Sequence, residues 1–194
     1  MTMTLLLASS SVYRRELLAR LGLAFLTAAP DADETPRSGE SVPALVERLA
    51  RLKAHTLADK FSSSLIIGSD QAATLQGASI GKPGTRAAAV AQLQAASGQT
   101  LVFYTGVCVL DARDGRVSSV VVPTVVHFRE LSTALIERYL DREPALDCAG
   151  SFKSESLGIA LCQRISSDDP TALIGLPLIA LVGLLHQFGV EVPV

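Results

Sequence analysis

Apolar runs and amphipathic segments alternate along the first half of the chain. The runs Thr4–Ala8, Phe25–Ala28 and Leu65–Gly68 have the length and composition of buried strands. Between them, Tyr13–Leu21 and Pro43–Phe61 carry leucines at helical spacing, and a serine that suits an N-cap precedes the second. This order predicts an α/β fold.

The second half predicts a hairpin with a helix on either side of it along the chain. Leu101–Leu110 and Val117–Phe128 are long β-branched runs joined by an Asp-Gly pair, which favours a tight turn. Thr85 caps a helix before the hairpin, Ser132 caps one after it, and Gly158–Ile165 is a further strand. Because a hairpin is antiparallel and helix-linked strands pair in parallel, we expect a mixed sheet with flanking helices.

Composition narrows the class of protein. The 194 residues fit a single domain spanning 1–194, and a hydrophobic content of 48% excludes a disordered chain. A net charge of −2 argues against a generic nucleic-acid binder. The cysteines Cys108, Cys148 and Cys162 lie far apart and form no CxxC pair. We interpret them as core residues in a reducing compartment.

The apolar C-terminal segment raises the question of a membrane anchor. Thr171–Val190 contains no Asp, Glu, Lys or Arg and is long enough to span a bilayer. However, Pro177 should divide it into a turn and a short helix. We favour a core helix over a tail anchor. Since the N-terminus lacks the pattern of a secretory signal, we expect a cytoplasmic protein with no membrane partner.

Common nucleotide-binding motifs are absent from the sequence. Gly77–Pro83 resembles a Walker A loop, but three residues separate its glycines instead of four, and Pro83 stands where a hydroxyl is required. There is no GxGxxG, and the three histidines are isolated, which argues against a His/Cys metal cluster.

Polar groups at the ends of the apolar runs carry the remaining candidate chemistry. Ser9–Arg15 suits an anion site of hydroxyls, N–H groups and a guanidinium, or ordinary helix capping. Asp31–Arg37 suits Mg²⁺ or a solvated loop. Asp70 directly follows a predicted buried strand, which favours function, whereas Lys53 and Lys82 are phosphate ligands or surface charges. Together these groups supply the hard oxygens and cations that phosphate–metal chemistry uses.

Short stretches along nearly the whole chain recur in the order and spacing of a known family. They are Leu7–Leu18, Asp33–Pro36, Ala50–Ala54, Ile67–Gln71, Gly81–Pro83, Ser97–Gly98, Thr105–Gly106, Cys148–Glu155 and Gly175–Pro177. With them the chain resembles the Maf family of nucleotide pyrophosphatases. The resemblance implies a mixed α/β fold of two lobes around a central cleft, like that of inosine-triphosphate pyrophosphatases. It also implies cleavage of a nucleoside triphosphate between its α and β phosphates with a divalent cation, Mg²⁺ or Mn²⁺, and it leaves a homodimer open.

The resemblance also assigns roles to individual residues. Asp70 is the expected general base, and Glu34 and Asp70 are the expected metal ligands. The expected triphosphate ligands are Ser9, Arg14, Lys53 and Lys82.

Three further positions indicate which branch of the family the chain resembles. The branch acting on dTTP and UTP has Arg at the position of Tyr13 and Thr at that of Gln71, so this chain looks like the branch that hydrolyses 7-methyl-GTP. An aromatic ring suits a cationic base, and Glu155 can accept two hydrogen bonds from guanine. The alternatives are a pyrimidine or broad-range pyrophosphatase, a nucleotide-binding regulator of cell division, and a tail-anchored protein.

Overall fold

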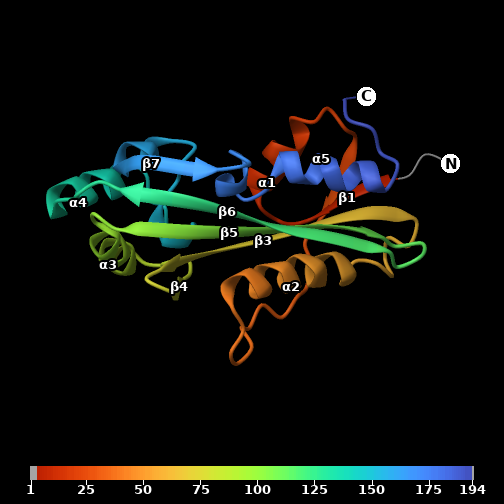
Figure 1. Ribbon diagram of the computed structural model, residues 1–194, viewed down its shortest axis with the longest axis horizontal. Coiled ribbons are helices and arrows are strands. Elements are labelled where there is room, and N and C mark those ends of the chain that lie inside the picture. The colour runs from red at the N-terminus through yellow and green to blue at the C-terminus, as the bar shows by residue number, and fades with distance from the viewer. Residues whose placement is uncertain (1–3, 194) are drawn as a thin grey trace. The chain divides into compact units, whose positions relative to one another are not determined.

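The computed structural model describes residues 4–193, which form both helices and strands (Figure 1). The strands are β1 (Thr4–Ala8), β2 (Phe25–Ala28), β3 (Ser64–Leu75), β4 (Ala78–Ile80), β5 (Thr100–Asp111), β6 (Val117–Phe128) and β7 (Cys162–Ser167). The α-helices are α1 (Val12–Ala19), α2 (Val42–His55), α3 (Arg86–Ala96), α4 (Thr133–Arg142) and α5 (Leu178–Gln187). Short 3₁₀ helices are η1 (Ala149–Ser151), η2 (Leu157–Leu161) and η3 (Ala172–Ile174).

The strands form one mixed sheet. The strand order is β2-β1-β3-β5-β6-β7, and β4 pairs with β3. β1 is parallel to both of its neighbours, whereas β3 with β4 and β6 with β7 are antiparallel. The mixed α/β fold expected from the sequence is therefore confirmed.

The chain divides into two compact units. The first contains the residues up to Asp70, Thr105–Val122 and the segment from Asp169 onward, and the second contains Gln71–Tyr104 and Pro123–Asp168. The long strands β3, β5 and β6 contribute residues to both units.

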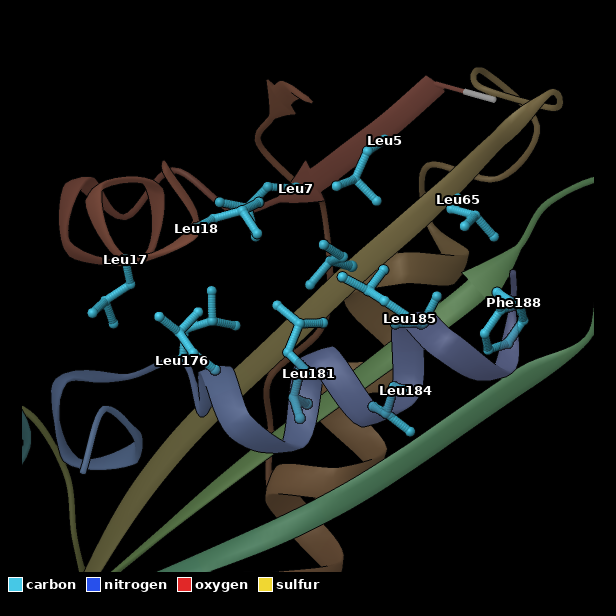
Figure 2. Packing of buried hydrophobic residues seen from close by; sticks show 14 residues of the cluster. Leu5, Leu7, Leu17, Leu18, Leu65, Leu176, Leu181, Leu184, Leu185 and Phe188 are labelled. Atoms are coloured by element: carbon cyan, nitrogen blue, oxygen red, sulfur yellow. The ribbon is translucent and has the colours of Figure 1, made fainter. Parts of the chain in front are cut away.

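The first unit has three layers because alternate residues of its strands face opposite sides of the sheet. Leu5 and Leu7 of β1 pack with α1 and α5, a cluster shown in Figure 2. Leu6 and Ala8 pack instead with α2 on the other face. Both faces of the strand are covered, which explains why its sequence is continuously apolar.

Two glycines let α2 approach the sheet closely. A Cβ built on Gly68 of β3 would overlap the backbone carbonyl oxygen of Ala50, and one on Gly106 of β5 would meet the carbonyl of Val46. Because no side chain intervenes, the backbone of α2 lies directly against the strands. This contact fixes where the last turn of the helix lies over β3.

The second unit has an aromatic core. Phe152 lies with its ring centroid 5.2 Å from that of Phe128 and 6.2 Å from that of Phe103. α3 packs against α4. Ser97 stabilises the turn after α3, where its hydroxyl accepts a 2.7 Å hydrogen bond from Leu131 N.

Three elements differ from the sequence prediction. β3 continues past Gly68 to Leu75, because its later residues pair with β4 in a hairpin. The helix predicted to reach Phe61 ends at His55, where the Thr56 hydroxyl donates to the Lys53 carbonyl and competes with helical bonding. The predicted strand Gly158–Ile165 begins as η2 and becomes β7 only at Cys162.

The apolar C-terminal segment is divided as expected. η3 and α5 lie on either side of Pro177, and α5 packs its leucines into the core cluster of Figure 2. Within residues 4–193, no helix has the length and apolar character needed to cross a membrane.

Candidate active site

The carboxyl end of β1 is a topological switch point. β1 lies between β2 and β3 and is parallel to both. α1, which connects β1 to β2, packs on one face of the sheet, and α2, which connects β2 to β3, packs on the other. Since the two connections diverge here, the end of β1 is the place where ligands bind in α/β sheets.

The Ser9–Ser11 segment links β1 to α1. Ser11 is the N-cap of α1, and its hydroxyl accepts from Arg14 N at 3.4 Å. Ser9 is buried, its Oγ accepts from Ser11 N at 3.0 Å, and its own N–H donates to the Leu7 carbonyl. The N–H of Ser9 is thus engaged, and its hydroxyl proton is the group left to donate to a ligand.

Arg14 lies in the first turn of α1 and is held by the segment after η3. Its Nε donates a 2.8 Å hydrogen bond to the carbonyl oxygen of Gly175. Burial lowers the pKa of the guanidinium from its ordinary value, while the negative charges of Asp70 and Glu34 oppose that shift. Arginine stays protonated regardless, so Arg14 presents a partly desolvated positive charge.

Lys53, Asp70 and Glu34 form an ionic cluster on the α2 face of β3. Lys53, in the last turn of α2, is only 6% exposed, and Asp70 only 8%. The Lys53 ammonium lies 2.6 Å from Asp70 Oδ1 and 2.8 Å from Glu34 Oε1. The Glu34 side chain remains 59% exposed. Asp70 was expected just beyond a strand end and lies instead inside β3, two residues after Gly68 and on the same face.

The loop that carries Glu34 is fixed by Arg48 of α2. Its guanidinium donates to Glu40 Oε1 at 2.6 Å and to the Thr35 carbonyl at 3.1 Å. The hydrogen bond between Arg48 and Glu40 lowers the pKa of Glu40 to about 2. A hydrogen bond with Thr35 lowers the pKa of Asp33 from its ordinary value. The sequence alone indicated no role for Arg48, because an arginine on a helix is usually a surface charge.

The donor set fits a divalent cation held together with a substrate. Across residues 4–193, no group of three His, Cys, Asp or Glu side chains is arranged to hold a metal. Glu34 and Asp70 nevertheless converge on one cation, the Lys53 ammonium. Mg²⁺ commonly takes one or two carboxylates and completes its shell with phosphate oxygens and water. Two carboxylates are therefore enough protein ligands for such a cation where phosphate oxygens complete its shell.

The expected site residues are divided between the two units. Ser9, Tyr13, Arg14, Glu34, Lys53 and Asp70 belong to the first unit. Lys82, Gln71 and Glu155 belong to the second, and the side chains of Lys82 and Glu155 are exposed there. The structure brings together the phosphate and metal candidates of the first unit. That Tyr13, Gln71 and Glu155 meet around one base stays a prediction.

Two buried residues of the site were not given roles from the sequence. The Ser69 hydroxyl lies 2.9 Å from the Gly175 carbonyl and 2.8 Å from that of Gly106. Asp169 is 2% exposed and accepts hydrogen bonds from the first residues of α5. The sequence signal for Asp169 was its position two residues before Thr171, a spacing typical of Asx turns.

Comparisons with known proteins identify the family of the chain. A family model described as "Maf-like protein" matches residues 4–188. A protein of Nitrosococcus oceani named "7-methyl-GTP pyrophosphatase" is 54% identical over 97% of this chain and 95% of its own length. Proteins of the same name from Aromatoleum aromaticum and Pseudomonas aeruginosa are 54% and 50% identical, over 97% of this chain and 97% and 98% of their own lengths.

A solved structure of a HAM1 protein from Coxiella burnetii aligns with 66% of this chain and 73% of its own, at 18% identity and a TM-score of 0.44. The family match covers nearly all of the described residues, including the whole ionic cluster. The resemblance inferred from short motifs is confirmed: the chain belongs to the Maf family.

Proposed function

We propose that this chain hydrolyses 7-methyl-GTP to 7-methyl-GMP and pyrophosphate. The observation that carries the proposal is the cluster at the end of β1, where a buried lysine joins two carboxylates within reach of the charge of Arg14. Relatives that are 50–54% identical over nearly their whole length are named for this activity. Phosphoryl transfer needs positioning and charge stabilisation and no covalent nucleophile, which matches this set of residues.

The cations of the chain neutralise the triphosphate. In the proposal, Arg14, Lys53 and Lys82 bind phosphate oxygens. The Ser9 hydroxyl donates a hydrogen bond to a phosphate oxygen, since its N–H is already used by Leu7. Glu34 and Asp70 would hold a divalent cation, Mg²⁺ or Mn²⁺, which would supply further positive charge to the triphosphate.

Asp70 acts as the general base. Its Oδ1 is held by Lys53, and its other oxygen makes no hydrogen bond or ion pair within residues 4–193. This oxygen takes a proton from water as the water oxygen attacks the α-phosphorus. The bond from the α-phosphorus to the bridging oxygen breaks, and pyrophosphate leaves with that oxygen.

Base choice is assigned to three side chains. Tyr13 stacks on the cationic 7-methylguanine, an attraction worth about 0.5–2 kcal/mol. Glu155 accepts hydrogen bonds from the guanine N1–H and amine, which uracil and thymine cannot match, and Gln71 completes the contact. The support for this assignment is the aromatic residue at 13 and the names of the relatives.

The cellular setting is also a proposal. All three cysteines are free thiols, which supports a reducing compartment and hence the cytoplasm. Burial raises the pKa of Cys108 to about 12, so this thiol stays protonated and unreactive. Light scattering would decide between a monomer and the homodimer that the family resemblance leaves open.

The test measures pyrophosphate release from 7-methyl-GTP, GTP, dTTP and UTP, with and without Mg²⁺. We expect 7-methyl-GTP to be preferred, and Asp70→Asn to lower kcat by about 10²–10⁴-fold. The matched control is Asp111→Asn, which changes a buried aspartate paired with Arg113 elsewhere in the first unit. Faster release from dTTP or UTP would favour the pyrimidine alternative. Binding without release from any of the four would favour a nucleotide-binding regulator.

A further inference from the structure

The carbonyl oxygen of Gly175 links Arg14 to β3, the strand that carries the proposed general base Asp70. It accepts a 2.8 Å hydrogen bond from Arg14 Nε and lies 2.9 Å from the hydroxyl of Ser69, which precedes Asp70 in β3. The bond to Nε fixes the plane of the guanidinium. The two amino groups of Arg14 make no hydrogen bond in the part of the chain that the structure describes, so they stay available to an anion.

The turn that presents this carbonyl is tightly held. Gly175 has φ +123°, a backbone conformation that favours glycine. Its N–H donates to the Ala172 carbonyl at 3.0 Å, and the buried Thr105 hydroxyl donates to the same carbonyl at 2.8 Å. The direction of the Gly175 carbonyl is therefore set by the turn and not by Arg14 itself.

Asp169 attaches the start of this turn to α5. Its Oδ1 accepts from Thr171 N at 3.1 Å, and its Oδ2 accepts from Ile179 N at 2.7 Å and Ala180 N at 3.1 Å. The N-cap position of α5 is Pro177, whose side chain contains no atom that could accept these bonds. The buried Asp169 side chain thus caps the helix, although it lies several residues before the N-cap position in the sequence.

Thr171 attaches the end of the same turn. Its hydroxyl lies 2.8 Å from both Asp169 Oδ1 and the Leu176 carbonyl, and its single proton bonds one of them at a time. The hydroxyl oxygen also accepts from Leu178 N at 2.8 Å. The chain is therefore tied to Asp169 on both sides of Gly175.

We propose that Asp169 is a positioning residue for Arg14, acting through the Thr171–Pro177 turn and the Gly175 carbonyl. The inference rests on the proposed function in taking Arg14 as a triphosphate ligand. Asp169 does not touch the substrate. Its carboxylate keeps the Gly175 carbonyl where it orients the guanidinium, and small misplacements of such a group reduce turnover strongly.

A double-mutant cycle separates positioning from stability. The wild type, Asp169→Asn, Arg14→Ala and the double variant are compared in affinity for inorganic triphosphate by calorimetry, and in kcat/KM for 7-methyl-GTP. We expect Asp169→Asn to weaken both at least about fivefold when Arg14 is present, and less than about twofold in the Arg14→Ala background. A residue that only stabilises the fold would show equal effects in both backgrounds.

Two further variants complete the test. Asp111→Asn removes a buried carboxylate that accepts from Arg113 Nε at 2.8 Å in the β5–β6 hairpin, and its effect should not depend on Arg14. Thr171→Val replaces Asp169→Asn in the cycle if the latter does not fold. If the effect of Asp169→Asn, or of Thr171→Val where it replaces Asp169→Asn, is the same with and without Arg14, the positioning role is overturned. A wild type that does not bind triphosphate overturns this inference together with the proposed role of Arg14, whereas binding without hydrolysis contradicts only the proposed function.

Discussion

The ammonium nitrogen of Lys53 lies 2.6 Å from Asp70 Oδ1, although the two residues are 17 positions apart in sequence. Neither residue is more than 8% exposed. A buried charge is costly unless it is paired, so each of these groups makes the burial of the other possible. Glu34 joins the pair from the solvent side, which leaves the cluster open to a ligand.

Lys53→Met should reduce both stability and activity. The variant leaves Asp70 buried without its cation, so the free energy of unfolding should fall by about 3 kcal/mol in urea denaturation. Adding Asp70→Asn should recover much of that loss while the protein stays inactive. Lys82→Ala is the control: its exposed side chain should change stability by less than about 0.5 kcal/mol, while kcat/KM falls because a triphosphate ligand is lost. Normal hydrolysis by both single lysine variants would mean that neither lysine binds the substrate.

Gly68→Ala should destabilise the first unit. The new Cβ would overlap the Ala50 carbonyl and push α2 from the sheet, at a cost of about 1–3 kcal/mol or more in unfolding free energy. Because Lys53 follows one turn after Ala50, turnover should fall as well. Gly183→Ala is the matched control, since a Cβ there meets nothing within 4 Å inside α5 and should stabilise by about 0.5–1 kcal/mol. A stable, active Gly68→Ala protein would show that this close approach is not needed.

Base preference should respond to Tyr13 and Glu155 and not to the phosphate ligands. Tyr13→Ala removes a stacking surface, and Glu155→Gln turns one acceptor towards donor groups, at a cost of about 1–3 kcal/mol. The quantity to measure is the ratio of kcat/KM for 7-methyl-GTP to that for UTP, which should fall in both variants. Lys82→Ala should lower both rates and leave the ratio unchanged. An unchanged ratio in Tyr13→Ala and Glu155→Gln would place base recognition elsewhere.

The Glu40–Arg48 pair should contribute to the acid stability of the protein. The pKa of Glu40 falls from 4.5 to about 2 in the folded state. A carboxyl group whose folded pKa is depressed stabilises the fold above its unfolded pKa and loses that contribution as the pH falls towards 2. Glu40→Gln should therefore show a smaller drop in urea midpoint between about pH 6 and about pH 3 than the wild type. Glu16→Gln, which removes the charge of an exposed glutamate of α1, is the matched control. If the urea midpoint of Glu40→Gln falls as far as that of the wild type, the Glu40–Arg48 pair is not formed in solution.

Local signals were sufficient for most of the fold. Ser11, Ser41, Thr85 and Ser132 cap their helices through side-chain oxygens, and such bonds form between residues three positions apart. Pro177 ends one element and begins another because its ring excludes a continuous helix. The mixed sheet followed from the apolar runs and one Asp-Gly turn. The elements predicted less well, β3 beyond Gly68 and the 3₁₀ start of β7, depend on pairing with distant segments.

The sequence by itself determined which residue types were available for phosphate chemistry, because Ser9, Arg14, Glu34, Lys53 and Asp70 stand in recognisable motifs. Only the tertiary structure decided how they are used. It joined Lys53 to both carboxylates, engaged the N–H of Ser9, and attached Arg14 to the Gly175 carbonyl, 161 residues away along the chain. The physical reason is that hydrogen bonds and ion pairs act over a few ångströms, and which groups come that close depends on how the layers pack. The order of residues along the chain does not contain those distances explicitly.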